Sequence, residues 1–488
     1  MKYTSGVIFQ NKQYTSINRS MLQIRNMAPR KIPIYMILLV MLFFGSSLQA
    51  TIAQSSGILP IQDSSPSSSL TALSNKSSTA NVSSNVVNST STTMPPTVVK
   101  IGALLPLTGA LASGGHTEKA ALDIAIKQIN ENLSNTNSKI RVSLVAEDTH
   151  TDPLVSLEKL KDLVAQGVSM VIGPVTSAEL STAKNYADTN GILLISPGST
   201  SVSLAIPGDH IFRFMPDDRT EAQALANKMW QDGIRVIVPM WRNDTFGNEL
   251  SKYVISDFEK LGGTVSAAIK YDPTATFPVP SNDNITSKYT NNNSIWRYVN
   301  NLSSETTKAT ALNGTNKVGI FLIAFDEVVP IFNQARDRPV LSTVKWYGTG
   351  GTAQNEALVR NSSASFFAIK TGFLNPLLVN EPNEKLTLLS SQIKNAIGNI
   401  SISSYSYPAY DALWVAALTE NATRGLTSNV DALKRTFTQI ADSYIGATGN
   451  TSLNAAGDRK YAHYDFWIVK QDAPPNTNSF HWERAPIS

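Results

Sequence analysis

Short apolar runs alternate with amphipathic stretches from residue 98 onward. The apolar runs are rich in β-branched residues and cover residues 98–105, 140–146, 170–172 and 192–195. Between them, apolar residues recur at helical spacing over residues 118–132, 153–166 and 178–189. The first pattern predicts strands and the second predicts amphipathic helices. Strand, helix and strand in series predict a parallel sheet with right-handed crossovers.

The same alternation starts again after Asp217. It predicts helices at residues 219–232, 248–261, 294–301 and 328–336, and strands at residues 235–239, 264–271, 318–324 and 345–347. A polar, Asn-rich stretch at residues 273–293 interrupts it. Two successive open sheets indicate two lobes, and ligands of such sheets lie beyond the carboxyl ends of the strands. The cleft between the lobes is therefore the expected site.

The chain before residue 97 lacks this alternation and differs in composition. Arg25, Arg30 and Lys31 precede an apolar run at residues 34–44, and small residues follow up to Ala53. This order is typical of a secretory signal. We expect residues 1–53 to be a leader that is either cleaved or kept as a membrane anchor, with translation starting at Met1 or Met27. Residues 54–96 are mostly Ser, Thr, Asn, Pro and small apolar residues, which predicts a disordered linker.

Asn-x-Ser/Thr sequons recur from Asn75 to Asn450. On a chain with an export signal they predict a glycosylated surface. We therefore expect an extracytoplasmic protein, either secreted or tethered to the outer face of the cell membrane.

Composition and charge exclude several classes of function. The 488 residues include 41 basic and 37 acidic side chains. Six of the 41 basic residues precede residue 54, where no acid occurs. The rest of the chain therefore has 35 basic against 37 acidic residues, with no excess of positive charge that would bind nucleic acid. The absence of cysteine excludes thiol catalysis, disulfides and a Cys-linked lipid anchor. The five histidines show no ligand spacing, so no metal site is expected.

No pattern of catalytic residues stands out. The chain has no G-x-S-x-G, no Walker sequence and no G-x-G-x-x-G between a strand and a helix. Glu147 and Asp148 are adjacent on a strand and point to opposite faces, so they do not form a cooperating acid pair. Asp148 is instead expected to stabilise the turn into Pro153. We expect neither an enzyme nor a cofactor.

Three loops follow strands of the first predicted sheet. They are L-P-L-T-G at residues 105–109 with S-G-G at 113–115, I-G-P-V-T-S at 172–177, and I-S-P-G-S-T at 195–200. Each is expected to place hydroxyls and unpaired N–H groups at a helix N-terminus, where the partial positive charge favours an anion such as a carboxylate. Helix capping explains any one loop alone. Three loops at one sheet edge indicate a ligand site.

Seven segments resemble, in order, the type I periplasmic binding proteins of the branched-chain amino acid and amide ABC transport systems. The segments are KIGALLPLTGALASGG, DPLVSLEKLKDLVAQGVSMVIGPVTS, GILLISPGSTS, FRFMPDDRTEAQALA, NDTFGNELSKYVISDFEKLGGTV, SYPAYDALWVAAL and TGNTSLNAAGDRKYAHYDFWIVK. They run from about residue 98 to 470. The resemblance to these Leu/Ile/Val-binding-protein-like chains implies an α/β fold of two Rossmann-like lobes joined by three crossovers.

The resemblance also implies discontinuous lobes. The first lobe would comprise residues 97–216 and 377–446, and the second residues 217–372 and 447–488. The crossovers would fall near Asp217, at 372–376 and at 446–451, and the strand at residues 464–469 would return to the second lobe.

The family's ligand residues carry over to particular positions. In its amino-acid binders, the serine after the G-P-x-x element and the S-P-x-x-T loop hold the ligand's α-carboxylate and amine. These positions correspond to Ser177, the main chain of Gly198 and Thr200, and Ser113 is added from the first loop. In the second lobe, Phe325, Asp326 and Thr349 are expected to close the other side.

Two positions depart from the family pattern. Gly114 stands where an aromatic residue is common, and Gly350 stands where an acid pairs with the ligand's ammonium group. Asp326 either replaces this acid or caps a helix. Phe325 and Trp241 either form apolar walls of the site or pack between helix and sheet.

The sequence thus predicts a protein that captures a small amino acid, amide or urea-like solute by lobe closure and delivers it to an ABC permease. The alternative is the ligand-binding ectodomain of a sensor or receptor with the same fold.

Overall fold

The computed structural model describes residues 95–274, 294–425, 429–473 and 479–486. The predicted leader, and the predicted linker up to residue 94, lie outside the described residues. Within the described ranges, no helix is long and apolar enough to cross a membrane.

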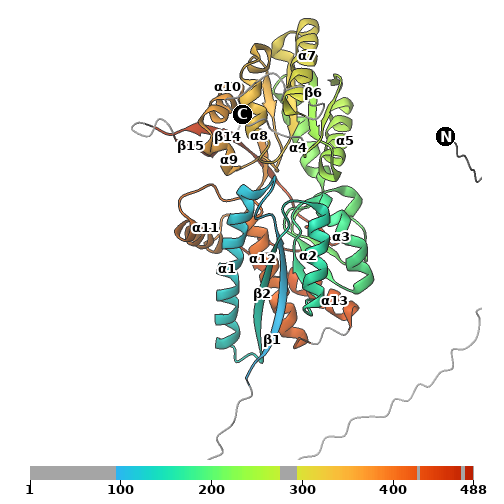
Figure 1. Ribbon diagram of the computed structural model, residues 1–488, viewed down its shortest axis with the longest axis vertical. Helices are drawn as coiled ribbons and strands as arrows, with labels where there is room; N and C mark the ends of the chain where they lie inside the picture. Colours follow the sequence, from blue (N-terminus) through green and yellow to red (C-terminus); the bar gives the residue numbers. More distant parts are fainter. Residues whose placement is uncertain (1–94, 275–293, 426–428, 474–478, 487–488) are drawn as a thin grey trace, which may run out of the picture. The chain divides into compact units, whose positions relative to one another are not determined.

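The first sheet has five parallel strands in the order β2-β1-β3-β4-β5. They are β1 (Thr97–Leu105), β2 (Ile140–Asp148), β3 (Met170–Ile172), β4 (Leu193–Ser196) and β5 (Ile211–Arg213). The helices packed with them are α1 (Ala112–Asn135), α2 (Pro153–Ala165), α3 (Ser177–Asn190), α11 (Glu384–Ile397), α12 (Ser406–Thr423) and α13 (Val430–Ser443). Together these elements form the first lobe (Figure 1).

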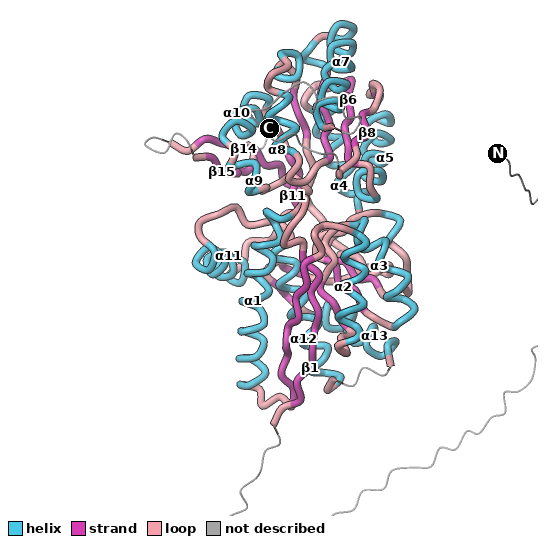
Figure 2. Tube along the Cα trace, in the orientation of Figure 1, coloured by secondary structure: helices cyan, strands magenta, loops and turns pink. Residues whose placement is uncertain are grey.

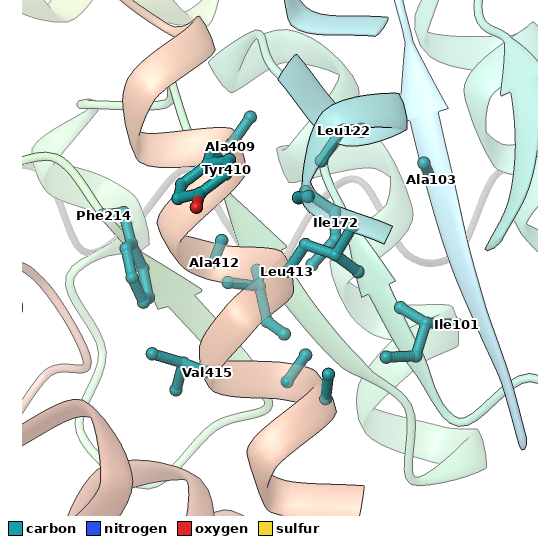
Figure 3. Packing of buried hydrophobic residues seen from close by; sticks show 14 of the residues in the cluster. Ile101, Ala103, Leu122, Ile172, Phe214, Ala409, Tyr410, Ala412, Leu413 and Val415 are labelled. Atoms are coloured by element: carbon teal, nitrogen blue, oxygen red, sulfur yellow. The ribbon is translucent and has the colours of Figure 1, made fainter. Parts of the chain in front are cut away.

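Both faces of the first sheet are covered by helices. Side chains alternate along β1, so that Ile101 and Ala103 pack with α1 and α12, whereas Leu104 packs with α2 and α3. Figure 3 shows Leu413 of α12 and Ile172 of β3 within the larger of these two clusters. Strands buried on both faces explain why the sequence reads as continuous apolar runs rather than as an alternation.

The second lobe repeats this plan (Figure 2). Its parallel sheet has the order β10-β9-β6-β7, and β8 also pairs with β6. The strands are β6 (Val236–Arg242), β7 (Thr264–Val265), β8 (Ile269–Tyr271), β9 (Val318–Ile323) and β10 (Lys345–Tyr347). The helices are α4 (Asp218–Gln231), α5 (Thr245–Lys260), α7 (Ile295–Asn313), α8 (Val328–Ala335), α9 (Glu356–Arg360) and α10 (Ser362–Thr371).

A third, antiparallel sheet packs against the second lobe. It comprises β11 (Asn375–Leu378), β14 (Tyr464–Gln471) and β15 (Phe480–Arg484). Val469, Phe480 and Trp482 of this sheet belong to the same apolar cluster as β6, α7 and α8. A short hairpin of β12 (Ile445–Gly446) and β13 (Gly449–Asn450) precedes β14.

Four predictions differ most from the structure. Helix α1 begins at Ala112, six residues before the expected start, so the S-G-G segment forms its first turn. The strand expected at 264–271 is two short strands, β7 and β8, and the helix expected at 294–301 continues to Asn313. The third loop leads into the 3₁₀ helix η2 (Val202–Leu204) rather than an α-helix.

The chain passes between the lobes later than the expected second and third crossovers. Phe373 and Leu374 pack in the clusters of the second lobe, and β11 pairs with β14 there. Ala447 and Leu453 pack in the cluster of the first sheet. The N–H of Val379 donates to the carbonyl oxygen of His463 at 2.8 Å, so the two passages run side by side. These contacts favour crossings near 379–383 and 460–463, instead of boundaries at 372–377 and 446–447.

Candidate ligand-binding site

The loops expected to bind ligand meet between the two lobes, around two small cavities. The first cavity is lined by Leu111, Val175, Thr176, Ser177, Gly198, Phe246, Phe325 and Tyr405. The second is lined by Leu111, Ser113, Gly114, Gly350, Gly351, Ala353, Gln354, Asn355, Glu356, Ser403 and Tyr405. Each has a volume of about 10 Å³, which is roughly the room that one water molecule needs. The structure therefore shows the two lobes closed on each other.

Ser177 organises the loop after β4. It begins α3 directly after Thr176, whose hydroxyl caps the helix in a capping box with Glu179. The Ser177 hydroxyl oxygen accepts hydrogen bonds from the N–H groups of Thr200 and Ser201 at 3.2 and 3.3 Å. The N–H of Thr200, which was expected to be free for a ligand, is thus bound by a hydroxyl of the protein itself.

Gly198 and Thr200 differ in their surroundings. The N–H of Gly198 donates to the hydroxyl oxygen of Ser196 at 3.4 Å, so this donor is also used within the loop. Thr200 is 4% exposed, and its hydroxyl lies beside the carboxyl group of Asp218. Burial raises the pKa of Asp218, and a hydrogen bond with the Thr200 side chain lowers it.

Ser113 and Asp326 connect the two lobes. The Ser113 hydroxyl donates to Oδ1 of Asp326 at 2.6 Å, and the Ser113 N–H donates to Oδ2 at 3.1 Å. Asn355 donates to the same carboxylate at 2.7 Å, and the N–H of Asp326 donates to the carbonyl oxygen of Ala110 at 3.0 Å. Asp326 caps no helix, because the capping position of α8 is Glu327 and lacks a side-chain cap. These hydrogen bonds hold the two lobes together in the closed form.

Of the remaining expected residues, Phe325 lines the site and Thr349 supports it. The Phe325 ring stacks on Phe246 with centroids 5.7 Å apart, and the guanidinium carbon of Arg242 lies 3.8 Å from its centroid. Thr349 is fully buried, and its hydroxyl accepts from the N–H of Gly351 at 3.2 Å. Trp241 packs in the cluster of α4 and α5 and donates its indole N–H to Asn248.

Glu221 of α4 lies beside Gly350, the position at which the resemblance to the family leads us to expect an acid. The N–H of Gly350 donates to Oε1 of Glu221 at 2.8 Å. A Cβ atom placed on Gly350 would lie 3.2 Å from Oε2 of the same carboxyl group. Burial raises the pKa of Glu221 to about 7, against a lowering by the Gly350 N–H. The sequence analysis missed Glu221, although its position four residues before the buried Leu225 places it on the inward face of α4.

The acid pair after β2 has separate structural roles. Glu147 pairs with Lys159 at 3.4 Å. Asp148 accepts from the N–H of His150 at 2.9 Å and from the hydroxyl of Thr108 at 2.8 Å, so it joins the turn after β2 to the first loop. In the part of the chain that the structure describes, no group of three or more His, Asp or Glu side chains is placed to hold a metal ion.

Comparison with known proteins identifies relatives of this architecture. A family model described as "Receptor family ligand binding region" matches residues 117–472. An uncharacterized protein of Methanocaldococcus jannaschii is 27% identical over 393 residues, which is 77% of this chain and 88% of that protein. The chemotactic signal transduction system substrate-binding protein BasB of Halobacterium salinarum is 27% identical over 184 residues, or 36% of this chain and 43% of that protein.

Solved structures share the fold at low sequence identity. The leucine binding protein LivK from Thermotoga maritima matches with a TM-score of 0.60 at 18% identity, covering 79% of this chain and 97% of that one. At this identity the likeness shows the fold alone, and it confirms the type I periplasmic binding protein fold predicted from the sequence.

Proposed function

The chain belongs to the family of receptor ligand-binding regions, and on that premise we propose that it is an extracytoplasmic protein that captures a small amino-acid-like or amide solute by lobe closure and delivers it to an ABC importer. The charge and apolar pattern of residues 25–53 supports export, with release from the cell or tethering to its outer face as the two outcomes. LivK, whose fold this chain shares, is named a leucine binding protein.

One observation carries the proposal: residues from both lobes line one cavity. Ser177 and Gly198 follow strands of the first sheet, and Phe325 follows β9 of the second. The bonds between Ser113 and Asp326 close the lobes beside it. A solute between the lobes would contact both and shift an open–closed equilibrium toward the closed form.

A sensor or receptor ectodomain is the second candidate. BasB, which matches part of this chain, is named a substrate-binding protein of a chemotactic signal transduction system. In that case the closed form would be read by a membrane partner other than a permease. Solute capture is common to both candidates.

Thermal denaturation in the presence of amino acids, amides, urea and small peptides tests solute capture. A solute that binds the native state raises the melting temperature. For the solute that raises the melting temperature most, Ser177→Ala should weaken the affinity measured by calorimetry by roughly 10- to 100-fold. This is the loss expected from removing one hydrogen bond to a charged group.

Ser181→Ala is the matched control, because Ser181 is exposed on the same helix. Its affinity should equal that of the unaltered protein. Failure of every solute to raise the melting temperature would contradict solute capture, and unchanged affinity in Ser177→Ala would contradict the placement of the ligand.

A further inference from the structure

Three carboxylates of the second lobe accept hydrogen bonds from serine N–H groups of the first lobe. Asp326 is one of them. Oε2 of Glu249 accepts from the N–H of Ser203 at 2.9 Å, and Oε2 of Glu356 accepts from the N–H of Ser401 at 2.7 Å. We call Glu249, Asp326 and Glu356 the interlobe acids. In each of these contacts the acceptor lies in the second lobe and the donor in the first.

The interlobe acids lie on different elements of the second lobe. Glu249 is on α5, Asp326 follows β9, and Glu356 is the first residue of α9. Figure 1 shows α5 and α9 at opposite sides of this lobe. The contacts are therefore spread across the interface between the lobes. Contacts spread in this way fix the angle between the lobes, whereas a single contact would leave one lobe free to rock on the other.

Two of the three serine N–H groups lie at helix starts. Ser113 and Ser203 are each the second residue of a helix, α1 and η2 respectively. The first N–H groups of a helix have no partner within it. Leu111, which precedes α1, has an apolar side chain and cannot accept from them. Closure supplies carboxylate oxygens as acceptors for these N–H groups, and opening returns both groups to water.

Asn355 links two of the interlobe acids within the second lobe. Its side-chain nitrogen donates to Oδ1 of Asp326 at 2.7 Å, and its side-chain oxygen caps α9, which begins at Glu356. The two oxygens of Glu356 have different partners, since Oε1 accepts from Nε of Arg360 at 2.6 Å and Oε2 accepts from Ser401. These acids are thus held in place within their own lobe, so closure has to order few further side chains.

Exposure to water limits the contribution of each contact. Glu249 and Glu356 are half-buried. A hydrogen bond to a charged group stabilises less near the surface than in the interior, because water competes for both partners. Loss of one such contact should therefore shift the open–closed equilibrium by roughly 2- to 10-fold. Contacts at separate places add their free energies, so the loss of two should multiply these factors.

We propose that Glu249 and Glu356, together with Asp326, are positioning residues for closure, which stabilise the closed form through contacts between the lobes instead of contacts with the solute. This inference rests on the proposed function and deepens it. Of the two cavities that the described residues enclose between the lobes, Glu249 lines neither and Glu356 lines the second. A change at Glu249 therefore tests closure separately from ligand contact.

Calorimetry and binding kinetics of Glu249→Ala, Glu356→Ala and the double variant test the proposal, with every solute that raises the melting temperature. Each single change should weaken affinity by roughly 2- to 10-fold, by the same factor for every solute, and the double change by the product of the two factors. The dissociation rate should rise while the association rate stays the same, because the closed form is lost and the encounter is not. A residue that only stabilises its own lobe would lower the melting temperature without changing the dissociation rate.

Two matched controls separate the contacts between the lobes from those within a helix. Glu259→Ala removes an exposed acid from α5, the helix that carries Glu249, and should leave affinity unchanged. Arg360→Gln removes the partner of Oε1 of Glu356 and keeps Oε2 for Ser401. It should therefore weaken affinity less than Glu356→Ala does.

Energy transfer in the absence of solute tests the same contacts independently of ligand binding. With labels on α3 and α7, at Ser181→Cys and Ser304→Cys, the double variant should show a lower transfer efficiency than the unaltered protein. An unchanged transfer efficiency in the double variant would overturn the inference, whether or not any solute binds. A loss of affinity confined to one solute would also overturn it, because the acids would then contact that solute.

These outcomes are distinct from failure of the proposed function. If a solute raises the melting temperature and the double variant binds it with full affinity, the inference fails and solute capture stands. If no solute raises the melting temperature, solute capture fails, and the transfer efficiency of the solute-free double variant still decides whether these acids hold the lobes together.

Discussion

Glu221 occupies the space that a side chain at position 350 would fill, although the two residues are 129 positions apart. The resemblance to the type I periplasmic binding proteins predicted that an acid was missing there, since G-T-G-G at residues 348–351 stands where that family has an acid. It does not show which distant side chain enters the vacated space. A signal nevertheless exists: Glu118 and Glu221 each precede a buried leucine by four residues, which places both acids on the inward faces of their helices.

At the same scale, Glu118 should make the stability of the ligand-free protein depend on pH. Burial, and second the charge of Glu179 on α3, raises its pKa to about 8 from an ordinary 4.5. The folded protein therefore holds this proton more tightly than the unfolded chain does. The resulting stabilisation is complete below about pH 4.5 and is lost as the pH rises through 8.

Glu118→Gln removes this dependence. Near pH 8.5 its melting temperature should exceed that of the unaltered protein by about 2–10 °C, and near pH 4.5 the two should agree within error. Scanning calorimetry at both pH values measures the difference. Glu131→Gln, at an exposed position of the same helix, should show no such gain at high pH. A Glu118→Gln variant less stable than the unaltered protein at pH 8.5 would show that the buried carboxyl is compensated.

At the scale of elements, the start of α1 decides where the first loop meets the second lobe. The periodicity of apolar residues began at position 118, but the helix begins at Ala112. Its first turn contains Gly114 and Gly115, where apolar periodicity gives no signal. A Cβ on Gly115 would collide with the carbonyl oxygen of Pro106, so glycine permits the loop after β1 to fold over the helix start. This packing presents Ser113 to Asp326.

Asp326→Ala should weaken closure without unfolding either lobe. The variant loses the bonds from Ser113 and Asn355, so the closed form is populated less and affinity for solute falls by roughly 3- to 30-fold. The loss should be similar for every solute that binds, whereas Glu221→Gln should act mainly on amines. Calorimetric titration of both variants makes the comparison, with the exposed Asp337→Ala as control. If Asp326→Ala weakened the binding of amines alone, Asp326 would bind the ligand instead of holding the lobes together.

At the scale of the molecule, the sequence predicted two α/β lobes and most strands, because apolar runs and helical periodicity report burial directly. The crossovers were harder to place. The chain from Ala447 to Asp458 stays with the first lobe, since the hydroxyl of Thr448 donates to Asp411 and Asp458 pairs with Arg213. These are contacts between polar side chains far apart in the sequence. The local periodicity of apolar residues does not report such contacts. For the same reason Glu221 beside Gly350 was not found from the sequence, and the ligand contacts of Ser177, Gly198 and Thr200 stay predictions.

Energy transfer between the lobes tests the central claim, that this protein captures a solute by closing. The chain has no cysteine, so Ser181→Cys on α3 and Ser304→Cys on α7, both exposed, give two unique labelling sites. Addition of whichever amino acid or amide raises the melting temperature should increase the transfer efficiency, and the increase should saturate at the affinity measured by calorimetry. A solute that binds by calorimetry while the transfer efficiency stays constant would contradict the account.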